Sequence, residues 1–175
     1  MMAAMGSYFG SEFKSETVGT IQVPLEVEPV VILKEKVNSL IYKYNLGNSV
    51  KLAETERGVV VRIYDDILFN SASSDLQNYS KLILSNVARV LKELPNDVRI
   101  EGHTDNIPIK SSVFLSNWHL SISRATNTAY YLMINEGLPQ ERVTIVGYAE
   151  YKPIDTNTTP AGRANNRRVD IVILN

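Results

Sequence analysis

Apolar residues recur at helical spacing in three parts of the chain. A period of about 3.6 residues runs over 30–44, 76–94 and 118–136, which predicts three amphipathic helices. Ser74 followed by Gln77 fits a capping box, in which the serine hydroxyl accepts a hydrogen bond from the first turn of the second helix. A glycine or proline follows each helix where a stop is expected; these residues are Gly47, Pro95, Gly137 and Pro139.

Short segments between and after the helices show the alternation, or the β-branched content, of half-buried strands. Five strands are predicted, at 51–54, 58–65, 98–102, 142–147 and 169–173. Residues 65–74 and 148–161 are predicted loops, and 162–168 is predicted as a polar turn or a single helical turn. This order favours an α+β fold: a mixed sheet with helices packed on one face, and parallel pairing where a helix lies between two strands.

Composition narrows the class of protein without naming a function. The chain has 175 residues, 44% of them apolar, which is enough for one ordinary domain with a core. Its net charge of −1 gives no field that attracts nucleic acid, and the absence of cysteine excludes disulfides and thiolate catalysis. Apolar runs such as 29–33 are far shorter than a membrane span.

The pattern also suggests how the chain is divided. Residues 1–7, MMAAMGS, have the composition of an added leader. Small, polar and proline-containing sequence over 8–29 predicts an irregular lead-in. Periodic sequence then begins, so residues 30–175 are expected to form one domain with the helix at 30–44 as its N-terminal extension.

The densest polar chemistry lies between residues 100 and 124, across the end of a buried strand, a polar loop and the start of a helix. Asp105 on the strand side is predicted to face Arg124 on the helix side. Such a pair suits a zwitterionic ligand, because Asp binds an ammonium while Arg forks onto a carboxylate. A plain salt bridge that fixes the loop to the helix explains the same two residues equally well. Thr104 and Asn106 add hydrogen-bonding groups beside the pair.

Two catalytic or metal-binding interpretations of this region each lack a necessary feature. A zinc site on His103 and Asp105 needs further ligands, and the other histidine, His119, is not at a metal-site spacing. A Ser/His/Asp hydrolase built on Ser121 or Ser123 has no G-x-S-x-G elbow. His103 is therefore expected to form local hydrogen bonds that shape the loop, and no catalytic residue, metal or cofactor is predicted.

Four ordered motifs resemble those of the OmpA-like peptidoglycan-binding domain. They are IEGHTD at 100–105, NWHLSISRA at 117–125, VGYAEYKP at 146–153 and GRANNRRV at 162–169. The resemblance covers roughly residues 59–174. It implies the α+β fold of that family, with its mixed sheet, helices on one face, and here an N-terminal lead-in helix.

The resemblance also implies a site for the diaminopimelate of peptidoglycan stem peptides. The family positions that hold this ligand fall on Asp105 and Arg124, the pair already selected on physical grounds. Thr104 and Asn117 match positions that line or shape the same pocket, and Arg167 matches an arginine that supports it.

Within the family, the long loop at 106–116 and the region 30–65 are similar to the periplasmic domains of MotB-type flagellar stator proteins. That similarity implies a non-catalytic wall anchor and a homodimer. It also implies a periplasmic part of a single-pass inner-membrane protein, whose membrane segment lies outside this sequence and binds a MotA-type channel subunit. Two alternatives stay open: a general envelope tether like OmpA or the peptidoglycan-associated lipoproteins, and a peptidoglycan hydrolase that uses His103 and Asp105.

Overall fold

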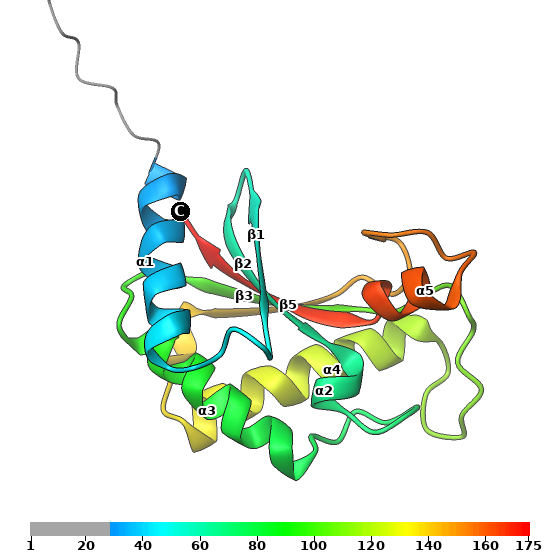
Figure 1. Ribbon diagram of the computed structural model, residues 1–175. Helices are drawn as coiled ribbons and strands as arrows, with labels where there is room; N and C mark the ends of the chain where they lie inside the picture. Colours follow the sequence, from blue (N-terminus) through cyan, green and yellow to red (C-terminus); the bar gives the residue numbers. More distant parts are fainter. Residues whose placement is uncertain (1–28) are drawn as a thin grey trace, which may run out of the picture.

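The computed structural model describes residues 29–175, which form a five-stranded sheet with helices against it (Figure 1). The predicted divisions at 1–7 and 8–29 lie outside the described residues, except for Pro29, which begins the first helix. In chain order the elements are α1 (Pro29–Lys43), β1 (Lys51–Thr55), β2 (Gly58–Tyr64), α2 (Asp65–Leu68), α3 (Asn78–Lys92), β3 (Val98–His103), α4 (Asn117–Tyr130), a π-helical turn (Tyr131–Asn135), a 3₁₀ turn (Gln140–Arg142), β4 (Val143–Gly147), α5 (Pro160–Asn166) and β5 (Arg168–Leu174).

The strands run in the order β1-β2-β5-β3-β4, so the last strand of the chain lies in the middle of the sheet. β3 and β4 are parallel, and the other neighbours are antiparallel. The predicted α+β fold, with a mixed sheet and an N-terminal helix, is confirmed. The expectation of parallel pairing wherever a helix separates two strands is wrong for β2 and β3, because β5 lies between them and pairs with both.

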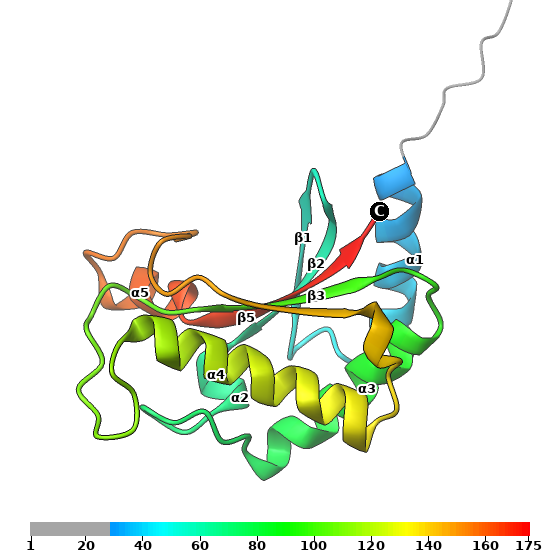
Figure 2. The ribbon, with the colours of Figure 1, turned by 180° about the vertical axis from the view of Figure 1, so that it is seen from behind.

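Strand alternation turns one row of side chains from each strand toward the helices. Val61, Ile171 and Ile100 lie side by side on β2, β5 and β3, and each is at most 1% exposed. Helices α3 and α4 lie along this face, while α1 and α5 lie at opposite ends of the sheet (Figure 1 and Figure 2). The buried apolar residues form one core cluster, and burial stabilises the fold by about 1.5–3 kcal/mol for each large apolar side chain.

The predicted capping box at Ser74 is wrong. Helix α3 begins at Asn78, and Gln77 occupies its N-cap position without a side-chain cap. The Ser74 hydroxyl instead accepts a hydrogen bond from the hydroxyl of Ser123 at 2.9 Å, and the Ser74 carbonyl accepts one from Asn127 at 2.7 Å. Both partners lie on α4, so tertiary contacts outweigh the local capping preference.

A short helix, α2, lies within the predicted loop 65–74, so that prediction is wrong at its start. The helical alternative for 162–168 is confirmed by α5, which begins two residues earlier, at Pro160. The hydroxyl of Thr159 caps α5 by accepting a hydrogen bond from the backbone N–H of Gly162 at 3.0 Å, and a proline occupies the first turn. Threonine followed by proline is an ordinary signal for the start of a helix.

The third predicted helix, 118–136, is confirmed with a change of winding near its end. α4 continues into the π-helical turn, and Gly137 follows with a left-handed φ of 72°, a conformation that favours glycine. α1 instead ends through Asn45, whose φ is 54°, before the predicted stop at Gly47. Within residues 29–175, none of the helices has both the length and the apolar character needed to cross a membrane.

Replacement of Gly102 by Ala is expected to lower the free energy of unfolding by about 2–3 kcal/mol. A Cβ at this position of β3 lies 2.0 Å from the backbone oxygen of Ser121 in α4, so the strand and the helix have to move apart. Gly47→Ala is the matched control, because its Cβ meets nothing within 4 Å. Urea unfolding followed by circular dichroism measures both variants. Wild-type stability of Gly102→Ala would contradict the close packing of β3 on α4.

Candidate functional site

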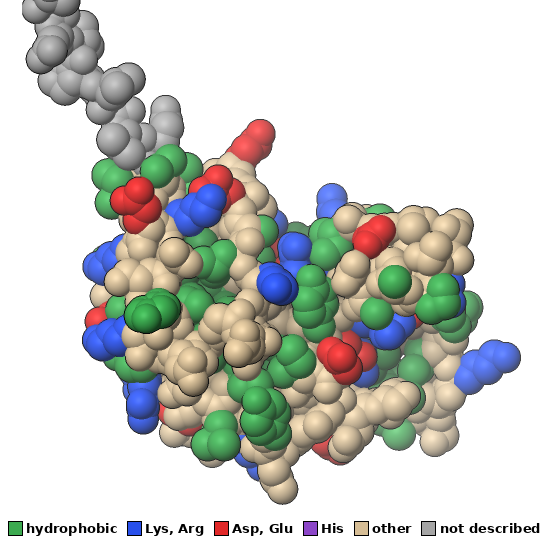
Figure 3. Space-filling view, viewed as in Figure 1, with side chains coloured by type: hydrophobic (Ala, Val, Ile, Leu, Met, Phe, Trp, Pro, Cys, Tyr) green, Lys and Arg blue, Asp and Glu red, His purple; other side chains and the backbone are tan. Residues whose placement is uncertain are grey.

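A hollow of about 580 Å³ opens where α2, the end of β3, the loop after β3, α4 and the end of α5 meet. We refer to it as the charged hollow. Figure 3 shows acidic and basic side chains next to one another at this part of the surface, near the position of α2 in Figure 1. Its lining carries three carboxylates and three basic groups, so it is strongly polar but balanced in charge; these residues are Asp65, Asp66, Asp105, Lys110, Arg124 and Arg167.

Arg124 lies on α4 and is 3% exposed. Its Nη1 binds Oδ1 of Asp65 at 2.8 Å, its Nε donates to the carbonyl of Ser73 at 2.8 Å, and its guanidinium lies 5.0 Å from the ring centroid of Phe69. Burial lowers the pKa of Arg124 and raises the pKa of Asp65, and the attraction between them opposes both shifts. The guanidinium is therefore fixed in direction by contacts on three sides.

Asp105 lies two residues after the end of β3 and is 6% exposed. Its Oδ1 accepts a hydrogen bond from the backbone N–H of Ile107 at 3.0 Å, and its Oδ2 binds Nη1 of Arg167 at 2.7 Å. Nε of Arg167 also lies 4.0 Å from Oδ2 of Asp65. The two ion pairs, Asp105 with Arg167 and Asp65 with Arg124, therefore lie side by side in one hollow.

The structure places both predicted binding residues in the charged hollow but does not pair them directly. Asp105 and Arg124 are each bound by another group within residues 29–175, so the alternative of a plain Asp105–Arg124 salt bridge does not describe the structure. Arg167, predicted in a supporting position, lines the same hollow and is the direct partner of Asp105.

Thr104 and Asn117 shape the loop and are not among the residues that line the hollow. The Thr104 hydroxyl donates to the carbonyl of Asp105 at 2.8 Å. The Asn117 amide donates to the carbonyl of Ile107 at 3.1 Å and accepts from the backbone N–H of Ile109 at 3.1 Å. These bonds fix the first residues of the loop, and therefore the wall of the hollow.

Three charged residues of the hollow, Asp65, Asp66 and Lys110, are not predicted from the sequence. Asp65 is the one that binds Arg124. It begins α2, directly after β2, and its backbone N–H donates to the carbonyl of Arg167 at 3.0 Å. The available signal was the pair Asp65-Asp66 at the end of a buried strand, a position where side chains often face a site. A predicted loop at 65–74 gives no reason to assign this pair to a site.

Neither Ser121 nor His103, the groups of the hydrolase alternative, lines the charged hollow with Asp105. Ser121 Oγ donates to the carbonyl of Trp118 and accepts from the backbone N–H of Ala149, at 3.0 Å each. His103 belongs to a different hollow from Asp105, and neither of its ring nitrogens has a hydrogen-bond partner within residues 29–175. The expectation that His103 forms local hydrogen bonds is therefore wrong, because its strand turns the ring away from the loop.

Three possible metal ligands lie close together on β3 and β5. Atoms of Glu101, His103 and Asp170 lie within 4.8 Å of one another. Each of the two carboxylates is already bound by two guanidinium groups, at 2.6 to 3.0 Å. A divalent cation in this position faces four guanidinium charges at close range, so we assign no metal to the cluster.

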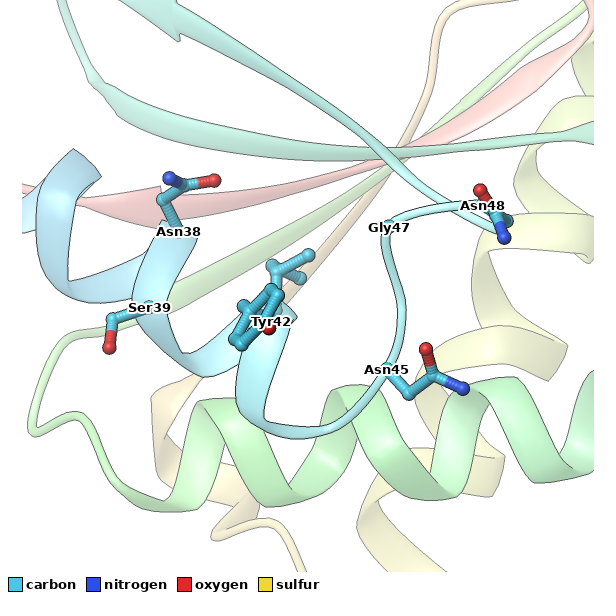
Figure 4. Close-up of a pocket in the computed structure, with 7 residues that line it drawn as sticks. Asn38, Ser39, Tyr42, Asn45, Gly47 and Asn48 are labelled. Carbon is cyan, nitrogen blue, oxygen red and sulfur yellow. The ribbon is translucent and has the colours of Figure 1, made fainter.

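Another hollow lies between the end of α1 and the segment that follows it (Figure 4). Its side chains come from α1, among them Asn38 and Tyr42, and from the connection to β1, among them Asn45 and Asn48. None of the residues that line it is charged. It therefore lacks the complementary charges that a zwitterionic ligand requires.

The comparisons with known proteins agree with this architecture. A model of the OmpA family matches residues 68–167. The chain is 37% identical over 141 residues to the uncharacterized protein YtxE of Bacillus subtilis, covering 81% of this chain and 58% of that protein. It is 36% identical over 143 residues to motility protein B of Bacillus subtilis, covering 81% and 55%. The chain thus spans a little over half the length of these relatives.

Solved structures show the same fold. The cell wall anchor of the T6SS from Pseudomonas aeruginosa superposes with a TM-score of 0.72 at 32% identity, covering 79% of this chain and 96% of that one. A periplasmic domain of Helicobacter pylori MotB superposes with a TM-score of 0.67 at 23% identity, covering 74% and 82%. At that lower identity the second likeness concerns the fold alone.

Replacement of Glu101 by Gln is expected to remove a pH-dependent part of the stability. Burial alone raises the pKa of Glu101, but the neighbouring His103 and the bound guanidinium of Arg57 outweigh it, and the pKa falls from 4.5 to about 2. A lowered carboxyl pKa contributes stability that is complete above pH 4.5 and is lost as the pH falls toward 2. We expect Glu101→Gln to lower the free energy of unfolding by about 2–3 kcal/mol at pH 7.

Urea unfolding of wild type and Glu101→Gln between pH 7 and pH 2 measures this contribution, and the two curves should converge at the acid end. Glu141→Gln, an exposed residue of the 3₁₀ turn, is the control and should follow wild type at every pH. A constant difference between Glu101→Gln and wild type across the range would show that the ion pair is not its source.

Proposed function

The chain belongs to the OmpA family, and from this membership we propose that it is a non-catalytic anchor that binds the diaminopimelate of peptidoglycan stem peptides. The observation that carries the proposal is the balanced set of charges in the charged hollow, where Asp105 and Arg124 lie beside their partners Arg167 and Asp65. The free centre of diaminopimelate is a zwitterion, and the hollow offers both charges that it needs.

The donors and acceptors of the hollow suggest how the ligand binds. The ligand carboxylate is placed against Arg124, whose Nη2 makes no hydrogen bond within the described residues, and against Arg167, whose side chain is 38% exposed. The ligand ammonium is placed against Asp105 and Asp65. Each half of the zwitterion then replaces part of an existing ion pair, so that no charge is left buried and unpaired.

The aliphatic part of the ligand also finds a suitable wall. Phe69, Ile107, Pro108 and Ile109 line the hollow beside the charged groups. The methylene chain between the two centres of diaminopimelate can pack on these side chains while its polar end reaches the ion pairs. The loop fixed by Asn117 therefore contributes an apolar wall for the ligand.

We propose further that the anchor serves a flagellar stator. On this proposal the chain is the periplasmic part of a single-pass inner-membrane protein, forms a homodimer, and works with a MotA-type channel subunit. Its similarity to motility protein B supports this assignment. A second candidate is a general envelope tether, which the likeness to a T6SS cell wall anchor and to outer membrane porin F of Pseudomonas aeruginosa favours.

The stem-peptide proposal predicts that Asp105→Asn and Arg124→Lys each weaken binding to diaminopimelate-type peptidoglycan at least about tenfold. The first substitution removes the charge that holds the ammonium, and the second removes the fork that holds the carboxylate. Co-sedimentation with purified sacculi over a range of protein concentrations measures the affinity. Asp97→Asn changes an exposed carboxylate outside the hollow and should bind as wild type does.

Lysine-type peptidoglycan gives an independent control of the ligand. Lysine keeps the ammonium but lacks the second carboxylate, so wild type should prefer the diaminopimelate-type wall by about tenfold, and Arg124→Lys should lose that preference. If folded Asp105→Asn and Arg124→Lys proteins sediment as wild type does, the charged hollow is not the binding site.

The stator proposal predicts a specific phenotype. Deletion of the complete gene in the source organism should leave flagella assembled but unable to rotate, and the full-length wild-type gene should restore swimming in soft agar. Full-length Asp105→Asn should not restore it, because an unanchored stator cannot bear torque. Normal swimming of the deletion strain, together with a weakened envelope, would favour the general tether.

A further inference from the structure

The face of the sheet opposite the α3–α4 layer carries a network of charged side chains. In the register of the sheet, Asp170 of β5 lies between Arg62 of β2 and Glu101 of β3. Alternation places His103 and Arg168 on the same face, two residues along each strand. These side chains line a hollow of about 390 Å³, which we call the open-face hollow. Figure 3 shows Lys and Arg side chains in the recess between the β1–β2 hairpin and the segment before α5.

The open-face hollow has an excess of positive charge. Each of its two buried carboxylates binds two guanidinium groups, at 2.6 to 3.0 Å. A lysine at the rim, Lys152, has no carboxylate partner in the part of the chain that the structure describes. Four cationic side chains and two carboxylates therefore line the hollow, an excess of two positive charges; the residues are Arg57, Arg62, Arg168, Lys152, Glu101 and Asp170. A fifth cation, Arg99, binds Glu101 from outside the lining.

His103 lies within this network with unused hydrogen-bonding capacity. Its ring is 3% exposed and stacks on Tyr148 with 5.3 Å between the ring centroids. Its Nε2 lies 3.7 Å from Glu101 and 3.9 Å from Asp170, which is beyond hydrogen-bond distance. Buried polar groups are normally paired. Neither ring nitrogen of His103 has such a partner within residues 29–175, so both are available to a ligand in the hollow.

We propose that the open-face hollow binds a phosphate or phosphodiester anion. Hydrogen bonds within residues 29–175 occupy both Nη atoms of Arg57 and leave its Nε free, and they leave Nη1 of Arg62 free. The side chain of Arg57 is 45% exposed and Lys152 is exposed, so both reach a ligand at the rim. Guanidinium and ammonium groups in this combination are the usual protein ligands of phosphate.

Charge decides which class of ligand fits. A cation in the hollow meets three guanidinium groups and an ammonium, whereas an anion reduces the excess of two positive charges. The charged hollow near α2 differs in this respect, because its acidic and basic groups are equal in number. The two hollows are therefore expected to bind different chemical classes, and the phosphate site does not depend on stem-peptide binding.

Isothermal titration of the protein with inorganic phosphate at pH 7 and constant ionic strength tests the site. We expect saturable binding to wild type and at least about fivefold weaker binding to Lys152→Gln. This variant should fold normally, because Lys152 is exposed. Lys110→Gln is the matched control: it removes a lysine from the charged hollow instead and should keep wild-type phosphate affinity.

Three results would overturn the proposal: no saturable heat with wild type, an unchanged affinity of Lys152→Gln, or a loss in Lys110→Gln equal to that in Lys152→Gln. The last result would place phosphate in the charged hollow. A second titration, with poly(glycerol phosphate), separates the sources of the anion. Tighter binding per phosphate to the polymer supports a phosphodiester chain, whereas binding to inorganic phosphate alone supports a small phosphate ligand.

Discussion

The insertion of β5 between β2 and β3 is the constraint on which both charged hollows depend. It brings the end of the chain against segments from its middle, so that Arg167 reaches Asp105 at 2.7 Å and its carbonyl accepts a hydrogen bond from Asp65. A few residues further along, Asp170 lies between Arg62 and Glu101 on the opposite face. A strand at the edge of the sheet has only one neighbour and cannot assemble either set of groups.

Within the charged hollow, the two ion pairs determine which charges a ligand must carry in order to bind. Arg124 is 3% exposed, and breaking such a buried pair without replacement costs roughly 3–5 kcal/mol. A ligand with a single charge can bind Asp105 or Arg124 but not both. It then displaces one protein partner and offers that partner no charge in return, so its net binding energy is small. A zwitterion can replace both halves at once. Selectivity for a zwitterion therefore follows from the internal pairing as much as from the individual side chains.

The strands and the three long helices could be predicted because periodicity is a local property of the sequence. Asp105 and Arg124 could be selected for the same reason: they flank one loop. Local pattern could not predict how they pair: Arg167, 62 residues from Asp105, is selected only through the family resemblance. Asp65 is not predicted at all, because it meets Arg124 only after α4 packs beside α2. The predicted cap at Ser74 is wrong for the same reason: its hydroxyl bonds to Ser123 of α4, which is distant in the sequence, and not to the start of α3.

The register of β5 protects both arrangements of charge. Val169, Ile171 and Ile173 face the core and are at most 1% exposed, while Arg168 and Asp170 face the other side. Because side chains alternate, a slip of one residue would put both charged groups into the core and the three apolar groups on the charged face. Burial of two unpaired charges costs more than the strand can recover from its hydrogen bonds. Burial of Val169, Ile171 and Ile173 therefore fixes the positions of the charged residues of β5, although they face the other side of the sheet. In this way the apolar core determines the geometry of both hollows.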